Sequence, residues 1–127
     1  MRNLSRLTVH IILLLMPIVA FATNHAVKDI PNVHLADSTQ FVSNPDGIIS
    51  AAAKMQADST LQALMRLTTA EVAAVVVDDI TEDADIDDFA TDLFREWGLG
   101  KKDNNNGLLI LIVKARRQVV FRTGYGL

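Results

Sequence analysis

Two uninterrupted apolar segments limit the folds open to this chain more than any other feature. Residues Val72–Val77 and Leu108–Val113 contain no polar side chain and are built from valine, alanine, leucine and isoleucine. Each is too short for an independent helix, and neither alternates with polar residues as a half-exposed strand does. They therefore predict two strands covered on both faces, which is the environment of a parallel sheet with helices packed on it.

Helical spacing of apolar residues predicts one helix from about Ser50 to Thr68 and another from about Ile86 to Trp97. The first has serine as its N-cap and places Asp58 on the polar face, away from the sheet. The second has Asp85 as its N-cap, and Gly98 follows it at the position that often takes a left-handed conformation. The two helices alternate with the apolar segments, as strand–helix–strand units require.

Shorter elements complete the order. Phe41-Val42 is a candidate first strand, and the turn-forming residues Ser43–Gly47 separate it from the first helix. Lys114–Arg117 is a short polar connection that leads into Gln118–Thr123, a candidate hairpin partner. The predicted order is β-α-β-α-β-β, and the predicted fold is an α/β layered sandwich with a mixed sheet.

The amino-terminal 22 residues have the pattern of a signal peptide. Arg2 and Arg6 precede an apolar stretch from Leu7 to Phe21, and Ala20-Phe21-Ala22 has the small-x-small pattern of a cleavage site. The alternative is a membrane anchor, but the stretch is shorter than the roughly 20 apolar residues that cross a bilayer. We therefore expect export to a periplasmic or other extracytoplasmic compartment.

Three regions are predicted: the signal peptide over residues 1–22, a flexible lead-in over 23–40, and one α/β domain over 41–127. His25 and His34 fall in the lead-in and receive no catalytic or metal role. The chain has no cysteine, so neither a disulfide nor a thiolate nucleophile is available. Its formal net charge of −3 disfavours nucleic acid as a partner, and no glycine-rich phosphate loop indicates a nucleotide cofactor.

An acidic segment is the strongest polar feature of the domain. Eight carboxylates lie between residues 78 and 92 with no basic side chain among them: Asp78, Asp79, Glu82, Asp83, Asp85, Asp87, Asp88 and Asp92. Some begin the second helix, where capping and the helix dipole favour anions. Clustered carboxylates also suit hard divalent cations. Both interpretations stay open from the sequence.

The predicted topology brings several of these residues to one end of the sheet. Ligands of open α/β sheets bind beyond the carboxyl ends of the parallel strands. The candidate metal ligands there are Asp46, Asp78, Asp79 and Asp88, and calcium is the favoured cation over magnesium. The hairpin carrying Arg116 and Arg117 is expected at the same end. Carboxylates beside arginines would suit a metal-assisted phosphoesterase, with Asp79 and Arg117 as weak catalytic candidates.

A second polar segment, Lys101–Gly107, is rich in asparagine and leads into the second apolar strand. Its residues favour a tight turn. The same topology places this segment at the opposite end of the sheet. Asp103 should therefore lie far from Asp79.

Four segments, taken in their order and spacing, resemble the TPM domain family. They are Val42–Ser50, Phe89–Lys101, Asn106–Leu111 and Arg117–Leu127. The family includes proteins of the thylakoid lumen and photosystem repair, a receptor modulator and many bacterial envelope proteins. The resemblance extends over about residues 41–127.

The resemblance implies an α/β sandwich on the periplasmic or lumenal side of a membrane. It also implies three candidate roles: divalent-cation binding, assistance in the assembly, repair or quality control of envelope proteins, and acid-phosphatase-like hydrolysis. Asn44 stands where the family usually has an acidic residue, and Asp46 is the candidate substitute. Family members continue beyond the position of Leu127, so a non-catalytic domain of a longer, membrane-anchored protein is a further possibility.

Overall fold

The computed structural model of this chain describes residues 24–100 and 105–126. The predicted signal peptide and Asp103 lie outside the described residues. In chain order the elements are β1 (Asn24–His25), η1 (Val27–Asp29), α2 (Val33–Ala36), β2 (Val42–Ser43), α3 (Ala51–Thr68), β3 (Glu71–Val77), β4 (Asp79–Ile80), α4 (Ile86–Glu96), β5 (Gly107–Val113) and β6 (Gln118–Thr123).

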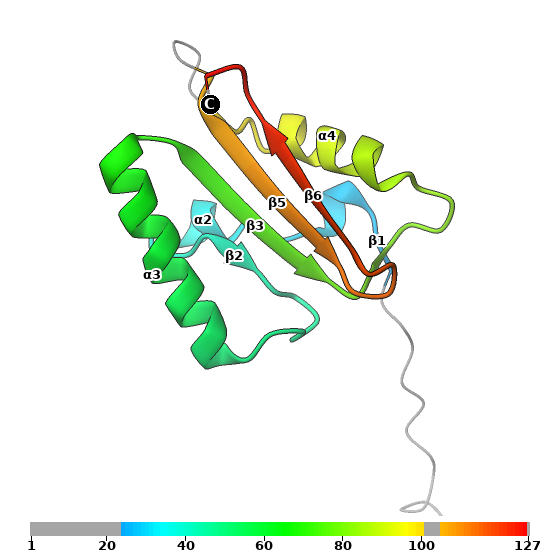
Figure 1. Cartoon of the computed structure of the whole chain (residues 1–127). Coiled ribbons are helices and arrows are strands. Elements are labelled where there is room, and N and C mark those ends of the chain that lie inside the picture. Colours follow the sequence, from blue (N-terminus) through cyan, green and yellow to red (C-terminus); the bar gives the residue numbers. More distant parts are fainter. Residues whose placement is uncertain (1–23, 101–104, 127) are drawn as a thin grey trace, which may run out of the picture.

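The main sheet has four strands in the order β2-β3-β5-β6 (Figure 1). Strands β2, β3 and β5 are parallel, and β6 is antiparallel to β5. The two apolar segments thus form the adjacent central strands. A separate parallel pair joins β1 to β4. The predicted α/β fold with a mixed sheet is confirmed.

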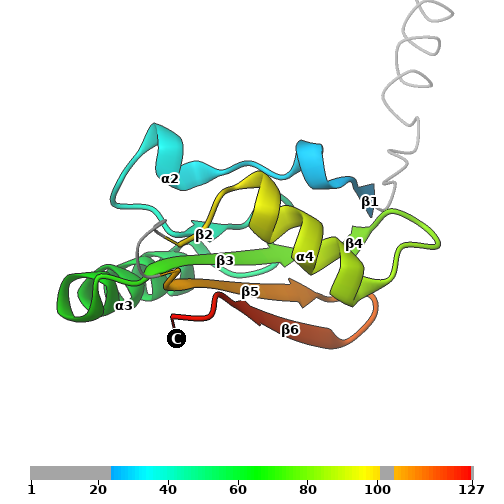
Figure 2. The same ribbon diagram turned by 90° about the horizontal axis from the view of Figure 1, so that it is seen from above.

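One face of the sheet carries the larger core. Side chains of β3 and β5 that point to this face, such as Val75 and Leu111, are fully buried against Phe89 and Leu93 of α4. Figure 2 shows α4 and the amino-terminal segment with α2 on this side of the sheet. The alternation of a strand explains why the neighbouring residues of β3 point to the other face.

The other face is covered by α3 over only part of its width. Ala57 and Leu61 of α3 pack on Val42, Ala74 and Val76 of β2 and β3. Over β5 and β6 the same face carries apolar side chains that remain partly or largely exposed; they include Ile110, Ile112, Val119 and Phe121. Figure 1 accordingly shows α3 beside the β2 end of the sheet.

The helix ends follow the local signals in the sequence. The Ser50 side chain accepts the Ala53 amide at 3.1 Å, and Asp85 accepts the Asp88 amide at 3.0 Å. Gly98 has φ +59°, as expected for the residue that follows a helix. None of the helices in the described ranges combines the length and the apolar character needed to cross a membrane.

The prediction for Asp58 is wrong. We expected it on the solvent side of the first helix, but it is 8% exposed and points toward the sheet. Its Oδ1 accepts the amides of Phe41 and Val42 at 2.7 and 2.9 Å, and its Oδ2 accepts Lys54 Nζ at 2.7 Å. The unpaired amides at the start of an edge strand need an acceptor, and α3 supplies one.

The segment before β2 contains elements that the sequence does not predict. Here β1 pairs with β4, and Ile30 joins the core on the α4 side of the sheet. The Thr81 amide donates to the His25 carbonyl at 3.0 Å and extends this pairing. The apolar residues of this segment show no periodicity because its elements are only two to four residues long.

The opposite end of the sheet is built by asparagine and glycine. Asn106 Nδ2 donates to the Thr69 carbonyl at 2.9 Å, and the Gly124 amide donates to the Gly107 carbonyl at 3.0 Å. These residues lie at the amino end of β5, whereas Asp79 follows the carboxyl end of the parallel strand β3. The predicted separation is therefore confirmed for residues 105–107.

Candidate functional site

Five polar residues gather where β3 ends: His25, Asp46, Asp78, Asp79 and Arg116. We call this group the carboxyl edge. Asp78 and Asp79 follow β3 directly, and Arg116 comes from the turn between β5 and β6. His25 arrives with β1, and Asp46 with the turn between β2 and α3. Segments far apart in the sequence meet here because parallel strands end at the same edge.

The turn that carries Asp46 is held by its own asparagine. Asn44 Oδ1 accepts the Ile48 amide at 2.9 Å, and Asn44 Nδ2 donates to the Ile49 carbonyl at 2.9 Å. Gly47 has φ +62° within the same turn. Asn44 thus acts in positioning the turn, and Asp46 is the turn residue whose carboxylate reaches the sheet.

Asp46 is tied to two other segments. Its Oδ2 accepts the Asp78 amide at 2.8 Å, and His25 Nε2 lies 2.9 Å from both carboxylate oxygens. Burial by itself would raise the pKa of Asp46, but the hydrogen bonds from the Asp78 amide and His25 outweigh it and lower the pKa. The carboxylate is therefore ionised, and His25 Nε2 carries the proton of the bond.

Removing the His25 side chain is expected to raise the pKa of Asp46. In His25→Ala the carboxylate loses the hydrogen bond and the electrostatic attraction of His25, and we expect this loss to outweigh the added exposure, so that the charged form becomes less favourable. Carbon-13 NMR titration of the Asp46 carboxyl group measures this change. His34→Ala is the control, because His34 Nδ1 donates to the Gln40 carbonyl and does not touch Asp46. An unchanged or lower Asp46 pKa in His25→Ala contradicts the interpretation.

Asp79 is engaged with Arg116. Its Oδ1 accepts two hydrogen bonds, from the Ile80 amide at 2.8 Å and from Arg116 Nε at 3.1 Å. The guanidinium also donates to the carbonyls of Thr81 and Ala84, which belong to the loop before α4. Arg116 therefore fastens this loop to the hairpin. Within the described residues, the Asp78 carboxylate and Asp79 Oδ2 accept no hydrogen bond.

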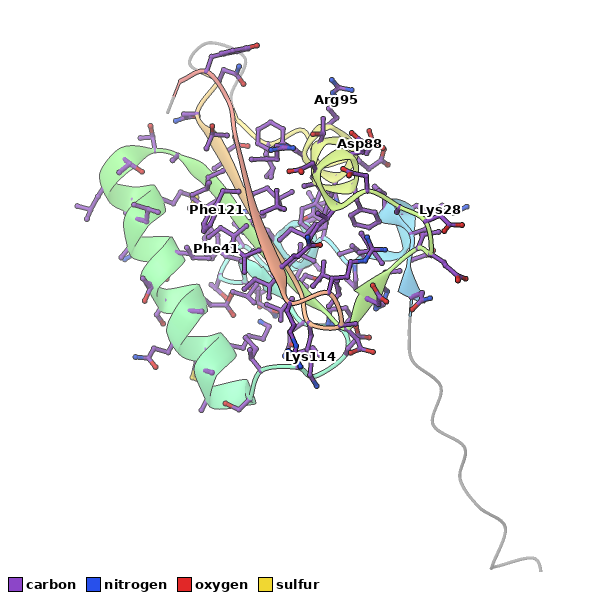
Figure 3. All side chains as sticks on the ribbon, turned by 45° about the vertical axis from the view of Figure 1, so that its right-hand side comes forward. Lys28, Phe41, Asp88, Arg95, Lys114 and Phe121 are labelled. Carbon is purple, nitrogen blue, oxygen red and sulfur yellow. The ribbon has the colours of Figure 1, made fainter. Side chains whose placement is uncertain are left out.

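The side chains of the other two predicted residues make no hydrogen bond or ion pair with this group within the described residues. Arg117 is exposed at the hairpin with φ +52°, and its amide donates to the Lys114 carbonyl at 3.1 Å. Asp88 is exposed in the first turn of α4. Figure 3 shows Asp88 on α4, well away from Lys114 in the hairpin turn.

Two further residues of the acidic segment begin α4 and fix it to the sheet. Asp85 is the N-cap, and Asp87 Oδ1 accepts Arg122 Nη2 at 3.0 Å. Arg122 Nε also donates to Thr91 Oγ1 at 2.9 Å, so β6 is joined to α4. These contacts give a structural reason for two of the carboxylates.

The carboxylate oxygens of Asp46, Asp78 and Asp79 are of the ligand type that a hard cation prefers. Residues 24–100 and 105–126 contain no group of three or more His, Cys, Asp or Glu side chains that could hold a metal ion. The metal roles of Asp46, Asp78, Asp79 and Asp88 stay predictions.

His25 is the member of the carboxyl edge that the sequence does not reveal. It lies in a segment without periodicity, and its partner Asp46 is 21 residues away. The one signal that points to it is chemical: a histidine close to the domain start is available to pair with a carboxylate. Only the pairing of β1 with β4 places it.

The architecture defines an open α/β sandwich with polar side chains from four segments at the carboxyl ends of its parallel strands. Residues 42–127 match the TPM domain family, and the chain belongs to this family. The solution NMR structure of the N-terminal domain of a protein from P. gingivalis is similar, with 41% identity and a TM-score of 0.75. That match covers 83% of this chain and 66% of the other. Comparison with curated proteins gives no significant match.

Proposed function

We propose that this chain is an extracytoplasmic TPM module that binds a divalent cation at the carboxyl edge and assists the assembly, repair or quality control of envelope proteins. Calcium is the preferred cation over magnesium. Binding to a partner, and not catalysis, is the activity of the module. The amino-terminal signal pattern supports the location, and family membership supports the class of role.

The observation that carries the cation proposal is the bond between Asp46 and the Asp78 amide. It brings the β2–α3 turn against the end of β3, so that the Asp46 carboxylate meets the backbone of Asp78, the first of two consecutive acidic residues. Calcium accepts six to eight oxygen ligands in flexible geometry, including backbone carbonyls and water. Because His25 holds both oxygens of Asp46, cation binding requires that His25 release at least one of them.

A phosphatase activity is less well supported by the same geometry. Phosphate recognition needs an arginine with free donors. The Arg116 guanidinium is already bonded to Asp79 and to carbonyls of the loop before α4, while Arg117 is exposed outside the group. Within the described residues, Asp79 pairs with Arg116, and no ion pair joins it to Arg117.

A titration of the purified chain with calcium, and separately with magnesium, tests the cation proposal. We expect saturable amide shifts in NMR spectra at Asp46, Asp78 and Asp79, with tighter binding of calcium. Asp46→Asn should weaken binding by about tenfold, because one charged ligand is lost. Asp37→Asn is the matched control, since Asp37 is an exposed turn carboxylate bonded to Thr39.

Three results would change the proposal. Absence of saturable shifts at millimolar cation contradicts the cation site. Shifts centred on Asp88 without Asp46 would move the site to the start of α4. Hydrolysis of a phosphomonoester that is lost on chelation and in Asp79→Ala would favour the phosphatase over the binding module.

A further inference from the structure

A cavity of about 520 Å³ lies at the amino end of β3, away from the carboxyl edge. Its walls come from α2, the end of α3, the start of β3 and the end of α4. The apolar side chains that form it include Phe41, Met65, Val72 and Trp97. This volume is within the range of sites that enclose an apolar ligand group, about 300 to 1,000 Å³.

The cavity continues into a groove. A second hollow of about 260 Å³ shares Asn32, Leu35 and Trp97 with the first. Leu35 is 84% exposed at this junction although it is a large apolar side chain. Figure 2 shows α2 and α4 on the same side of the sheet. Leu35 of α2 and Glu96 of α4 both line the second hollow. Two connected hollows suit an extended chain better than a compact small molecule.

One wall of the cavity includes a part of the β3 edge that β2 does not pair, at Val72, which is 5% exposed. The Glu71 amide points toward β5 and donates to the Asn106 carbonyl. The Ala74 amide points toward β2 and donates to the Phe41 carbonyl. Backbone groups alternate along a strand, so Val72 directs its amide and carbonyl to the β2 side. Strand β2 pairs with β3 only from Ala74 onward.

Asp58 keeps this edge open. The Phe41 amide belongs to the segment that leads into β2, and it donates to Asp58 and not to β3. Within the described residues, no strand therefore pairs with Val72 on this side. Val72 and Phe41 both line the cavity, so the open edge and the apolar walls belong to one site.

We infer that this groove binds an extended, apolar polypeptide segment by strand addition to β3 at Val72, with one large side chain in the cavity. Main-chain hydrogen bonds supply affinity in this mode, and pockets for alternate side chains supply specificity. The segment fits a partially unfolded protein, whose strands are exposed and apolar. The inference rests on the partner-binding half of the proposed function and is independent of the cation.

The single tryptophan of the chain, Trp97, reports on the groove. The probe is the peptide acetyl-Lys-Val-Phe-Val-Lys-amide, added to the purified chain once with EDTA and once with excess calcium. We expect a saturable change of Trp97 emission with a Kd of about 100 µM or lower, and amide shifts at Val72 and Phe41 in NMR spectra. Peptides N-methylated at the phenylalanine, or at the valine that follows it, test the backbone bonds. At least one should bind about tenfold more weakly.

Two variants separate a groove effect from a general one. Leu35→Glu places a charge at the junction of the two hollows and should weaken binding by about tenfold. Leu67→Glu is the matched control, because Leu67 is 86% exposed on α3 and lines neither hollow. Both substitutions are at exposed positions, so both chains should fold.

Failure of the groove is distinguishable from failure of the cation site. The inference is overturned if Trp97 emission shows no saturable change at millimolar peptide, if both N-methylated peptides bind as well as the parent, or if shifts are confined to the partly covered face around Phe121. Calcium binding without peptide binding removes the groove alone. Peptide binding that is equal with EDTA and calcium supports the groove whether or not a cation binds.

Discussion

Replacement of Asp58 by alanine is expected to lower the free energy of unfolding by about 3 kcal/mol. The substitution removes the acceptor of two buried amides, those of Phe41 and Val42, and leaves Lys54 without its partner. A loss of this size in a domain of about 100 residues lowers Tm by roughly 10 to 20 °C. Urea unfolding followed by circular dichroism measures the change. Asp92→Ala, an exposed carboxylate on α4, is the control and should change stability by less than about 0.5 kcal/mol.

The same carboxylate gives a defined pH dependence. Burial by itself would raise the pKa of Asp58, but hydrogen bonds from Lys54 and from the amides of Phe41 and Val42 outweigh it and lower the pKa. A lowered pKa in the folded state stabilises the protein above the unfolded value, about 3.9, and this stabilisation is lost as pH falls through the folded pKa. The stability difference between the parent and Asp58→Asn should therefore shrink below about pH 4. A difference that grows in acid contradicts the assignment.

Gly107→Ala is expected to cost about 3 kcal/mol of stability for a steric reason. A Cβ at this position would lie 2.6 Å from the Leu99 carbonyl carbon and 2.7 Å from the Gly100 amide nitrogen. Both are backbone atoms, so no side-chain rotation relieves the clash. The start of β5 would have to move away from the segment after α4. Thermal unfolding followed by calorimetry measures the loss.

Gly98→Ala separates this clash from a conformational effect. Gly98 has φ +59°, and a Cβ there meets nothing within 4 Å. Its replacement should cost only about 1 kcal/mol, which is the penalty for a left-handed residue with a side chain. Equal losses in Gly98→Ala and Gly107→Ala would show that backbone conformation, and not close packing, governs the start of β5.

These two sites differ in how far they could be foreseen. Gly98 was predictable because a helix end is a local event, decided by residues within one turn. The close approach at Gly107 was not, because it depends on where the segment after α4 passes. Asp58 shows the same limit: helical spacing indicates which residues share a face, but not that an edge strand would need a carboxylate from that helix.

The candidate site was predictable to the extent that topology determines it. Asp46 and Asp78 were expected at one end of the sheet from strand order alone, and a hydrogen bond joins them there. The contacts of Arg116 with Asp79 and with the loop before α4 were not predictable, since side-chain partners depend on loop paths. His25 was placed outside the domain because two-residue strands leave no periodic pattern.

The sequence by itself determined the elements whose causes are local or repetitive. Continuous apolar runs specified the two buried strands, helical spacing and caps specified α3 and α4, and turn residues specified the connections. Only the tertiary structure decided which polar groups face each other. Buried amides and carboxylates must find partners at a distance in sequence, and the packing of α3, β1 and the hairpin supplies them. That requirement explains the burial of Asp58, the pairing of His25 with Asp46, and the open edge at Val72.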